Sequence, residues 1–378
     1  MRLFLALTLA LSAAATPPAS ADPTPNPPGS NPPGPHLPAP TGRHPVGTTS
    51  LHLVDTSRAD PWVPSSRREL MVSLFYPAAS ARGPRRQYLT PTESRAVLEE
   101  AGLTALPPDA LSAVRTHSVV DARPAGRPRS RPLVVLSPGF KRPRATLTAL
   151  AEDLASHDYV VVVVDHTHEN VATTFPDGRV APCAACDQPH DPAFWEELER
   201  GRAADVSFVL DQVTGPLRHR SGAALVDPER IAMGGHSVGG ASSLAALAAD
   251  PRLRAGVDVD GTITAASSTA RPFLLLGRAD NYAPGTPGAG NWAEVWPSLT
   301  GWRRWLVVAG MEHASFTDLG VLGPQLGVDF GADVSGERGA AITRAHVRAF
   351  FDLHLRGEPQ PLLDRPSPRY PEVAVVGS

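Results

Sequence analysis

Residues 159–164 place five consecutive valines directly after a tyrosine. β-branched side chains favour extended backbone, and a strand that is apolar on both faces has to be covered on both faces. Such strands are typical of a central, mostly parallel sheet with helices packed against each side. This run therefore predicts an α/β fold.

The order of the neighbouring segments supports the same architecture. Extended apolar runs occupy residues 69–76, 133–136, 159–164, 230–234, 255–260, 272–276 and 305–309. The spacing of apolar residues predicts helices near residues 147–154, 191–210, 241–249 and 339–355. Strands that alternate with helices build a mostly parallel sheet with helices on both faces. In such sheets, functional groups gather at the carboxyl ends of the strands.

The amino terminus has the composition of a secretory signal peptide, predicted over residues 1–21. A basic start precedes an apolar run, residues 3–15, that is well short of the roughly 20 residues needed to span a membrane. An Ala-Ser-Ala sequence then supplies the small residues that signal peptidase recognises. Residues 22–45 are rich in proline and glycine and are expected to form a flexible leader. A single secreted domain is then predicted over residues 46–378.

The two cysteines, Cys183 and Cys186, have C-x-x-C spacing between Pro182 and Pro189. A redox motif would need a strand before it and a helix that begins at it, and a metal site would need two further ligands close by. In a secreted chain, a local disulfide is the expected state. A loop this short would be stabilised by about 2 kcal/mol at most in the chain-entropy model.

The pattern Gly235-x-Ser237-x-Gly239 follows the predicted strand 230–234. A helix of small residues is predicted directly after it, and this strand–turn–helix context is the one in which the pattern carries a nucleophilic serine. Glycine at both flanking positions avoids collisions in such a tight turn. We therefore expect Ser237 to be held at the edge of the sheet with its Oγ exposed.

A nucleophilic serine needs a base, and in this fold the base should be a histidine in a loop after the last strands. His313 follows the predicted strand 305–309, whereas His346 and His354 lie inside the predicted last helix. His313 is therefore the expected base.

Two aspartates suit the acid that would orient this base. Asp260 ends the predicted strand 255–260, and Asp280 follows the predicted strand 272–276. Many hydrolases of this fold take the acid from the later strand, so the pattern alone leaves both residues as candidates.

Backbone N–H groups are expected to stabilise the oxyanion. One should come from Val238, the residue after the nucleophile, and the other from a loop after an earlier strand. In the loop 136–140, Gly139 allows an unusual backbone, and Phe140 N–H is the best candidate for the second donor.

The sequence gives little support for a metal site or for nucleic-acid binding. The run His166-x-His168-Glu169 follows the valine strand, where it more often orders a loop or lines a pocket than binds a metal, and further ligands are not found. Arg202 interrupts the apolar side of the predicted helix 191–210. A net charge of -3 gives no reason to expect nucleic acid as a partner. No metal and no cofactor are expected.

Together these residues resemble the plasma-type platelet-activating-factor acetylhydrolase family and its bacterial relatives. The resemblance covers roughly residues 68–355. It rests on Leu-Met-Val-Ser-Leu-Phe-Tyr-Pro at 70–77, Ser-Pro-Gly-Phe at 137–140, Val-Asp-His at 164–166, Gly-His-Ser-Val-Gly-Gly at 235–240, Val-Asp-Gly at 259–261 and Glu-His-Ala-Ser-Phe-Thr-Asp at 312–318. The family takes its acid from the earlier strand. The resemblance therefore implies an α/β-hydrolase fold with the triad Ser237, Asp260 and His313.

The same resemblance implies calcium-independent hydrolysis of short or oxidised sn-2 acyl chains of phospholipids. The expected partner is then a small-molecule or lipid ester, with transient contact with a lipid surface. Residues 277–284 are also similar to the acid loop of secreted polyesterases and cutinase-like lipases. That similarity would make Asp280 the acid, and triglycerides or polyesters the substrates.

Overall fold

The structure is a computed structural model that describes residues 34–377. The predicted signal peptide, residues 1–21, and the first part of the predicted leader lie outside the described residues.

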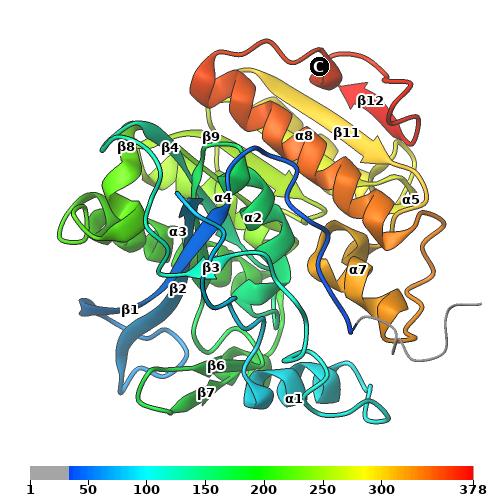
Figure 1. The fold of residues 1–378 in the computed structure, drawn as a ribbon. Helices are drawn as coiled ribbons and strands as arrows, with labels where there is room; N and C mark the ends of the chain where they lie inside the picture. Colours follow the sequence, from blue (N-terminus) through cyan, green and yellow to red (C-terminus); the bar gives the residue numbers. More distant parts are fainter. Residues whose placement is uncertain (1–33, 378) are drawn as a thin grey trace, which may run out of the picture. The chain divides into compact units, whose positions relative to one another are not determined.

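A ten-stranded sheet runs through the described part of the chain (Figure 1). Its order is β12-β11-β10-β9-β8-β4-β5-β2-β1-β3. The strands are β1 (Val46–Ala59), β2 (Arg67–Pro77), β3 (Val119–Val120), β4 (Arg131–Ser137), β5 (Val160–Asp165), β8 (Val226–His236), β9 (Leu253–Val259), β10 (Phe273–Arg278), β11 (Arg303–Val308) and β12 (Val373–Gly377). Neighbouring strands from β11 to β5 pair in parallel, whereas β12–β11, β5–β2 and β2–β1 are antiparallel. The predicted mostly parallel sheet is confirmed.

The valine strand, β5, lies where the parallel part of the sheet meets the antiparallel hairpin of β1 and β2. It pairs in parallel with β4 and antiparallel with β2. Its side chains alternate between two cores, with Val160, Val162 and Val164 on one face and Val161 and Val163 on the other. All five are fully buried, as a strand that is apolar on both faces requires.

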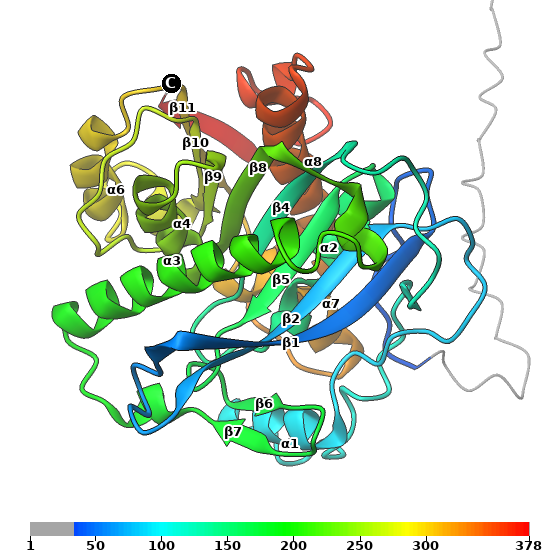
Figure 2. The same cartoon turned by 90° about the vertical axis from the view of Figure 1, so that its left-hand side faces the viewer.

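Helices cover both faces of the sheet (Figures 1 and 2). The helices α3 (Pro192–Thr214) and α4 (Val238–Ala249) pack on one face, and α2 (Thr148–Ser156) and α8 (Gly336–Arg356) on the other. The remaining elements are α1 (Pro91–Glu100), α5 (Ala279–Tyr282), α6 (Ala289–Val295), α7 (Asp318–Gln325) and a separate hairpin of β6 (Ala172–Thr174) and β7 (Val180–Pro182). None of the described helices is both long and apolar enough to cross a membrane.

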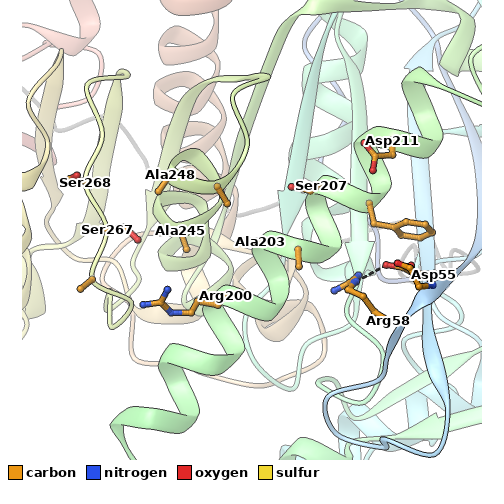
Figure 3. A pocket seen from close by; sticks show the side chains of 15 residues that line it. Asp55, Arg58, Arg200, Ala203, Ser207, Asp211, Ala245, Ala248, Ser267 and Ser268 are labelled. Carbon is orange, nitrogen blue, oxygen red and sulfur yellow. Dashed lines mark hydrogen bonds and ion pairs between the residues drawn. The ribbon is translucent and has the colours of Figure 1, made fainter.

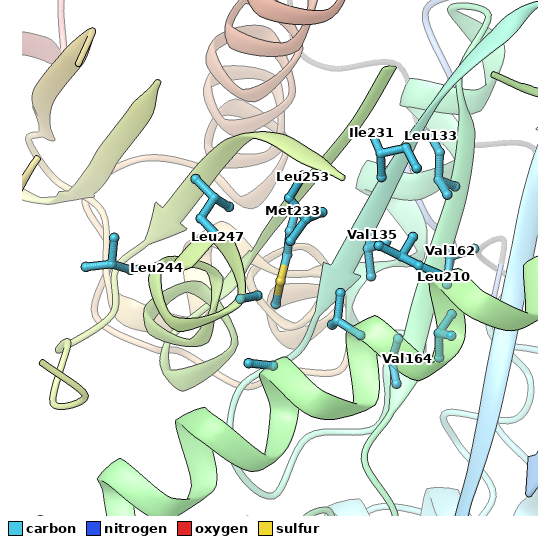
Figure 4. Packing of buried hydrophobic residues seen from close by; sticks show 14 of the residues in the cluster. Leu133, Val135, Val162, Val164, Leu210, Ile231, Met233, Leu244, Leu247 and Leu253 are labelled. Atoms are coloured by element: carbon cyan, nitrogen blue, oxygen red, sulfur yellow. The ribbon is translucent and has the colours of Figure 1, made fainter. Parts of the chain in front are cut away.

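The core between the sheet and the helices α3 and α4 holds the two elements on either side of Ser237, which are β8 and α4 (Figure 4). Val135 of β4 and Met233 of β8 face Leu210 of α3 and Leu244 of α4 across this layer. Complete burial of one such side chain contributes about 1.5–3 kcal/mol. This packing holds β8 and α4 in place, and with them the turn between the two.

The predicted ends of two helices have clear local causes. The Asp191 side chain accepts a hydrogen bond from Phe194 N–H, and Pro192 occupies the first position of α3. At the end of α8, Gly357 adopts a left-handed conformation with φ of 72°, which glycine reaches without steric cost. Both caps lie within two residues of the predicted helix ends at 191 and 355.

The predicted leader needs a correction. From Gly34 onward the chain forms one compact unit, so the boundary at residue 46 was placed too late. Leu37 is fully buried, and Arg344 of α8 donates hydrogen bonds to the carbonyl oxygens of Pro38 and Ala39. A proline-rich segment builds no core of its own, but its apolar side chain and free carbonyl groups complete a surface that the domain provides. Residues 34–45 are therefore packed against the domain, not flexible.

Candidate active site

Ser237 stands on a strained turn between β8 and α4. Its φ of 56° and ψ of -132° lie in a region of backbone dihedral angles that residues other than glycine seldom adopt, at a cost of about 1–3 kcal/mol. A Cβ atom at Gly235 would lie 2.3 Å from the carbonyl oxygen of Ser137, and one at Gly239 would lie 2.1 Å from the same atom. Because this obstacle is backbone, both positions require glycine, as the sequence pattern indicates.

His313 and Asp260 meet in this region although they are far apart in the sequence. His313 begins the short 3-10 helix His313–Phe316 after β11, and Asp260 directly follows β9. The distance from His313 Nδ1 to Asp260 Oδ2 is 2.5 Å. The other carboxylate oxygen of Asp260 accepts a hydrogen bond from the Arg278 backbone N–H at 2.8 Å. A carboxylate at Nδ1 favours the tautomer that leaves Nε2 free to accept a proton.

Asp280 takes a different position. It lies in α5 with a side chain that is 62% exposed, and it forms an ion pair with Arg278 at 3.4 Å. The structure thus brings Asp260, and not Asp280, into contact with His313. This geometry matches the acid that the family resemblance implied.

One cavity of about 470 Å³ contains these groups, within the usual size range of small-molecule sites. Its lining consists of Trp195, Ser237, Val238, Asp260, Thr262, Thr264, Arg278, Asn281, Tyr282 and His313. It therefore combines the serine of the strained turn, a histidine–carboxylate pair and aromatic side chains.

Both candidate oxyanion donors adjoin Ser237. Val238 is the first residue of α4, where the backbone N–H groups have no partner within the helix. Phe140 follows Gly139, at which an added Cβ would lie 3.3 Å from Ser237 Cβ. No hydrogen-bond acceptor meets Phe140 N–H among residues 34–377. The loop that carries Phe140 thus touches the nucleophile turn and leaves a backbone donor free.

His236 is a residue of the site that the sequence analysis did not single out. Its Nε2 lies 2.9 Å from the His313 carbonyl oxygen, and the two imidazole rings are 4.3 Å apart. Burial, followed by the neighbouring His313, holds the pKa of His236 well below its usual value, so the ring is neutral and donates from Nε2. His236 therefore supports the backbone that carries His313. His236 lies inside the Gly235-x-Ser237 pattern, and this position is the sequence feature that could have identified it as a residue of the site.

The spacing of these groups also resembles a metal site. Ligand atoms of His236, Asp260 and His313 all lie within 4.8 Å of one another. However, His313 Nδ1 faces the Asp260 carboxylate and His236 Nε2 faces a backbone carbonyl. The pairing of His313 Nδ1 with the Asp260 carboxylate suits a base and its orienting acid, whereas the second ring nitrogen of His236, Nδ1, is buried without a hydrogen-bond partner among the described residues.

An aromatic cluster borders the pocket on the side of α3. Phe140, Phe194, Trp195 and His190 lie with ring centroids 4.6–5.7 Å apart. Trp292 lies outside this cluster: its side chain is fully buried and stacks on Tyr282.

The predicted disulfide is present next to this cluster. Cys183 and Cys186 are bonded to each other, and Cys183 packs against the small buried cluster of Ala185, Phe194, Leu198 and Val238.

The run His166-x-His168-Glu169 does not converge on one point. His166 and Glu169 are buried and belong to a network of hydrogen bonds, whereas His168 turns away and its Nδ1 faces the Pro182 carbonyl oxygen at 3.0 Å. The run orders its loop, which is the role expected from the sequence.

A larger cavity of about 850 Å³ lies elsewhere, between α3, α4 and the end of β1 (Figure 3). Small side chains form most of its lining, together with the pair of Arg58 and Asp55, whose nitrogen and oxygen are 2.5 Å apart. The residues that line it include no histidine or cysteine, so it offers no base for a nucleophile. The smaller cavity at Ser237 is the candidate active site.

Comparison with known proteins points to esterases. A model of the family described as platelet-activating factor acetylhydrolase, isoform II, matches residues 33–183. A probable 1-alkyl-2-acetylglycerophosphocholine esterase of Arthroderma benhamiae is 27% identical over 363 residues, which cover 86% of this chain and 90% of that protein. Cutinase 2 of Thermobifida cellulosilytica is 25% identical over 200 residues, which cover 43% of this chain and 66% of that protein.

A solved structure is similar over its whole length. The ferulic acid esterase from Streptomyces cinnamoneus matches with a TM-score of 0.80 and 44% sequence identity, covering 91% of this chain and 100% of that one. The strand order, the serine turn and these relatives agree with one another. The chain belongs to the same family of α/β-hydrolases as this ferulic acid esterase and is a carboxylic ester hydrolase, and its residues 33–183 are similar to platelet-activating factor acetylhydrolase, isoform II.

Proposed function

We propose that the protein hydrolyses carboxylic esters through an acyl-enzyme on Ser237, with His313 as base and Asp260 as orienting acid. The observation that carries this proposal is the contact between His313 Nδ1 and Asp260 in the cavity that also contains Ser237. A neutral imidazole held in this tautomer presents Nε2 as the proton acceptor.

The reaction proceeds in two acyl-transfer steps. His313 removes the proton from Ser237 as Oγ attacks the ester carbonyl carbon, and the same proton then goes to the leaving alcohol. Water, activated by His313, attacks the acyl-enzyme and releases the carboxylic acid. Asp260 stays ionised throughout and stabilises the imidazolium that forms in each step.

Two backbone N–H groups, those of Val238 and Phe140, bind the oxygen that becomes negatively charged. Both adjoin Ser237, and both are free of other partners in the structure described above. Loss of one such donor in other hydrolases lowers kcat by about 10²–10³-fold. The two groups therefore supply a large part of the rate acceleration.

Short-acyl esters of glycerophospholipids are the first candidate substrates. The matching family model and the relative from Arthroderma benhamiae, whose name describes an acetylglycerophosphocholine esterase, support this class. The protein would contact a lipid surface only transiently when it takes up such a substrate.

Esters of aromatic acids are the second candidate, and one observation favours them. Trp195 lines the cavity and packs edge-on against Phe140, so a planar acyl group has aromatic surface to contact. The ferulic acid esterase structure is 44% identical to this chain. Polyesters and triglycerides, suggested by the cutinases, have the support of relatives that match less than half of the chain.

We also propose that the protein is exported after cleavage of residues 1–21. The disulfide between Cys183 and Cys186 supports this proposal because such bonds persist in oxidising compartments. Sequencing of the amino terminus of protein from culture medium tests it, and the expected first residue is Asp22.

The active-site assignment is tested with a fluorophosphonate probe and p-nitrophenyl butyrate. Ser237→Ala is expected to abolish labelling, and Asp260→Asn to lower kcat by about 10²–10⁴-fold because the imidazole loses its preferred tautomer. Asp280→Asn, the matched control, should stay within about threefold of wild type. Full labelling of Ser237→Ala, or a greater loss in Asp280→Asn than in Asp260→Asn, would contradict the assignment.

The substrate class is tested with three esters on the same enzyme: an acetylated glycerophosphocholine, methyl ferulate and emulsified tributyrin. The highest kcat/KM on the first supports the phospholipid class, and the highest on methyl ferulate supports the aromatic class. Activity confined to the emulsion would move the protein toward the lipases.

A further inference from the structure

A buried arginine connects α3 to the loop that carries Phe140. Arg202 has a side chain that is 1% exposed. Its Nη1 donates hydrogen bonds to the Pro138 carbonyl oxygen and, at 3.2 Å, to Ser137 Oγ. Its Nε donates to Glu169 Oε2 at 2.7 Å. The guanidinium group thus joins a fixed carboxylate to the backbone two residues before the proposed oxyanion donor.

The carboxylate of Glu169 is itself held from several sides. Its Oε1 accepts hydrogen bonds from Arg68 Nη2 and from Trp62 Nε1, each at 3.0 Å. Arg68 lies on β2, Trp62 lies in the connection from β1 to β2, and Arg202 lies on α3. Because Arg68 and Trp62, both outside α3, hold this carboxylate, Arg202 has a rigid support.

A second chain of hydrogen bonds reaches the same loop. Ser137 Oγ lies 2.9 Å from His166 Nε2, and His166 Nδ1 lies 2.8 Å from Asp205 Oδ2. Burial, followed by Arg202, lowers the pKa of His166, so the ring is neutral. It donates to Asp205 and accepts from the Ser137 hydroxyl. Ser137, His166 and Asp205 are all buried, so this chain has a structural role and receives no substrate.

The loop is confined between Arg202 and the nucleophile turn. A Cβ at Gly239 would lie 2.5 Å from the Pro138 carbonyl oxygen. The Pro138 carbonyl oxygen therefore lies against both the serine turn and the guanidinium group. Rotation about the Gly139 backbone bonds, which follow this peptide, redirects the N–H group of Phe140.

We propose that Arg202 is a positioning residue for the oxyanion hole. It fixes the Pro138–Gly139 peptide and thereby directs Phe140 N–H toward the reacting carbonyl oxygen. The inference rests on the proposed function of Ser237 and adds a residue that touches neither the substrate nor the triad.

The physical basis is the steep dependence of oxyanion stabilisation on geometry. A donor works only when it points at the oxygen that becomes charged, and a misplacement of about 1 Å costs on the order of 100-fold in rate. Weakened positioning should affect the transition state more than the bound ester. We therefore expect a loss in kcat with little change in KM.

Arg68 provides a matched control. Its side chain is also 1% exposed and contacts the same Glu169 carboxylate. It donates its other hydrogen bonds to Asp60, Asp205 and the Thr167 carbonyl oxygen, and none to loop residues 137–140 within the described part of the chain. Removal of either arginine takes one cationic partner away from buried carboxylates that keep their other hydrogen bonds, so both variants should lose stability.

The experiment compares Arg202→Met with Arg68→Met at a temperature where both remain folded, as measured by circular dichroism. Arg202→Met is expected to lower kcat for p-nitrophenyl butyrate at least tenfold with KM within threefold of wild type. Arg68→Met, whose side chain reaches the loop only through Glu169 and Asp205, should lower kcat clearly less than Arg202→Met does, although its Tm falls by a similar amount. The preference for the ester over its thionoester analogue should shrink more in Arg202→Met than in Arg68→Met, because this ratio reports on the oxyanion hole.

A kcat within threefold of wild type for Arg202→Met, or an equal loss in both variants, would overturn the proposal.

If Arg202→Met does not fold, Arg202→Lys and Arg68→Lys replace the pair. A lysine ammonium keeps the charge but lacks the planar fork that holds two acceptors at once, so kcat should fall at least fivefold in Arg202→Lys alone. Wild-type kcat in Arg202→Lys would then refute the proposal. Ser237→Ala is measured in parallel, and activity that survives in it would mark a failure of the proposed function instead.

Discussion

Glu199 illustrates how single buried residues hold the backbone near the site. Its carboxylate oxygens accept hydrogen bonds from the backbone N–H groups of Thr264 and Ala265, each at 2.9 Å. These residues belong to the segment that follows Asp260, and Thr264 lines the cavity. Burial raises the pKa of Glu199 to about 6. The folded protein therefore binds this proton more tightly than the unfolded chain does.

This shift predicts a pH-dependent stability difference between wild type and Glu199→Gln. A raised pKa contributes stability at low pH that is lost as the pH rises through about 6. Relative to Glu199→Gln, wild type should lose about 2 kcal/mol between pH 4.5 and pH 7.5, since one pKa unit corresponds to about 1.4 kcal/mol. Urea unfolding of both proteins across this range measures it. A constant difference between the two would contradict the prediction.

A second prediction for a single residue concerns Gly239. A Cβ there would meet the Ser137 carbonyl oxygen at 2.1 Å, and backbone atoms on both sides cannot rotate away. Gly239→Ala should reduce kcat at least 100-fold, because it displaces both Ser237 and the loop 137–140, and should destabilise the protein by about 1–3 kcal/mol.

Gly201 is the control for this substitution. It lies inside α3 with open space where a Cβ would stand. Gly201→Ala is expected to raise stability by about 0.5–1 kcal/mol, since alanine favours the helix, without a change in kcat. Thermal unfolding and p-nitrophenyl butyrate turnover measure both variants, and a similar loss of activity in the two would argue against the steric explanation.

At the scale of elements, α3 organises one side of the site. Trp195, Glu199 and Arg202 are spaced four and three residues apart and so share one helix face. Trp195 lines the cavity, Glu199 holds the segment after Asp260, and Arg202 holds the loop before Phe140. The sequence showed Arg202 only as an interruption of an apolar face. Its buried partners come from distant elements, so its role could not be predicted from the helix alone.

The disulfide loop before α3 gives a prediction for this element. Cys183→Ser with Cys186→Ser should lower the free energy of unfolding by up to about 2 kcal/mol in the chain-entropy model. Because Cys183 packs against the cluster that contains Phe194 and Val238, KM for p-nitrophenyl butyrate should also rise, with kcat within threefold. Treatment of wild type with a reductant should reproduce the change in KM. A large loss of kcat would instead indicate that the loop supports the reacting groups directly.

At the scale of the whole molecule, residues 34–45 belong to the folded unit. Two proteins, starting at residue 22 and at residue 46, should therefore differ in stability. Loss of the segment exposes the pocket that Leu37 fills and leaves the buried Arg344 guanidinium without two acceptors. We expect a difference of about 3–5 kcal/mol from these two effects, measured by denaturant unfolding. A chain starting at residue 34 serves as the control and should match the longer protein.

The sequence by itself determined the α/β architecture and the elements around the site. Five valines in β5 need cover on both faces, and glycines beside Ser237 are required because backbone atoms lie within about 2.5 Å of where a Cβ would stand. Both patterns can be recognised in short stretches of sequence, although the backbone oxygen that excludes a Cβ at both glycines belongs to Ser137 of β4. They sufficed to predict β2, β4, β8, both ends of α3 and α8 to within a few residues, and the disulfide.

Tertiary structure alone decided which distant groups meet. Asp260 and Asp280 both follow strands of the same sheet, and only the packing of β9 against β10 and the path of the loop after β11 place one of them at His313. The ion network of Arg202, Glu169 and Arg68 likewise joins three elements. Its members are stable in the interior only as partners of one another, and no spacing along the chain encodes such a pairing.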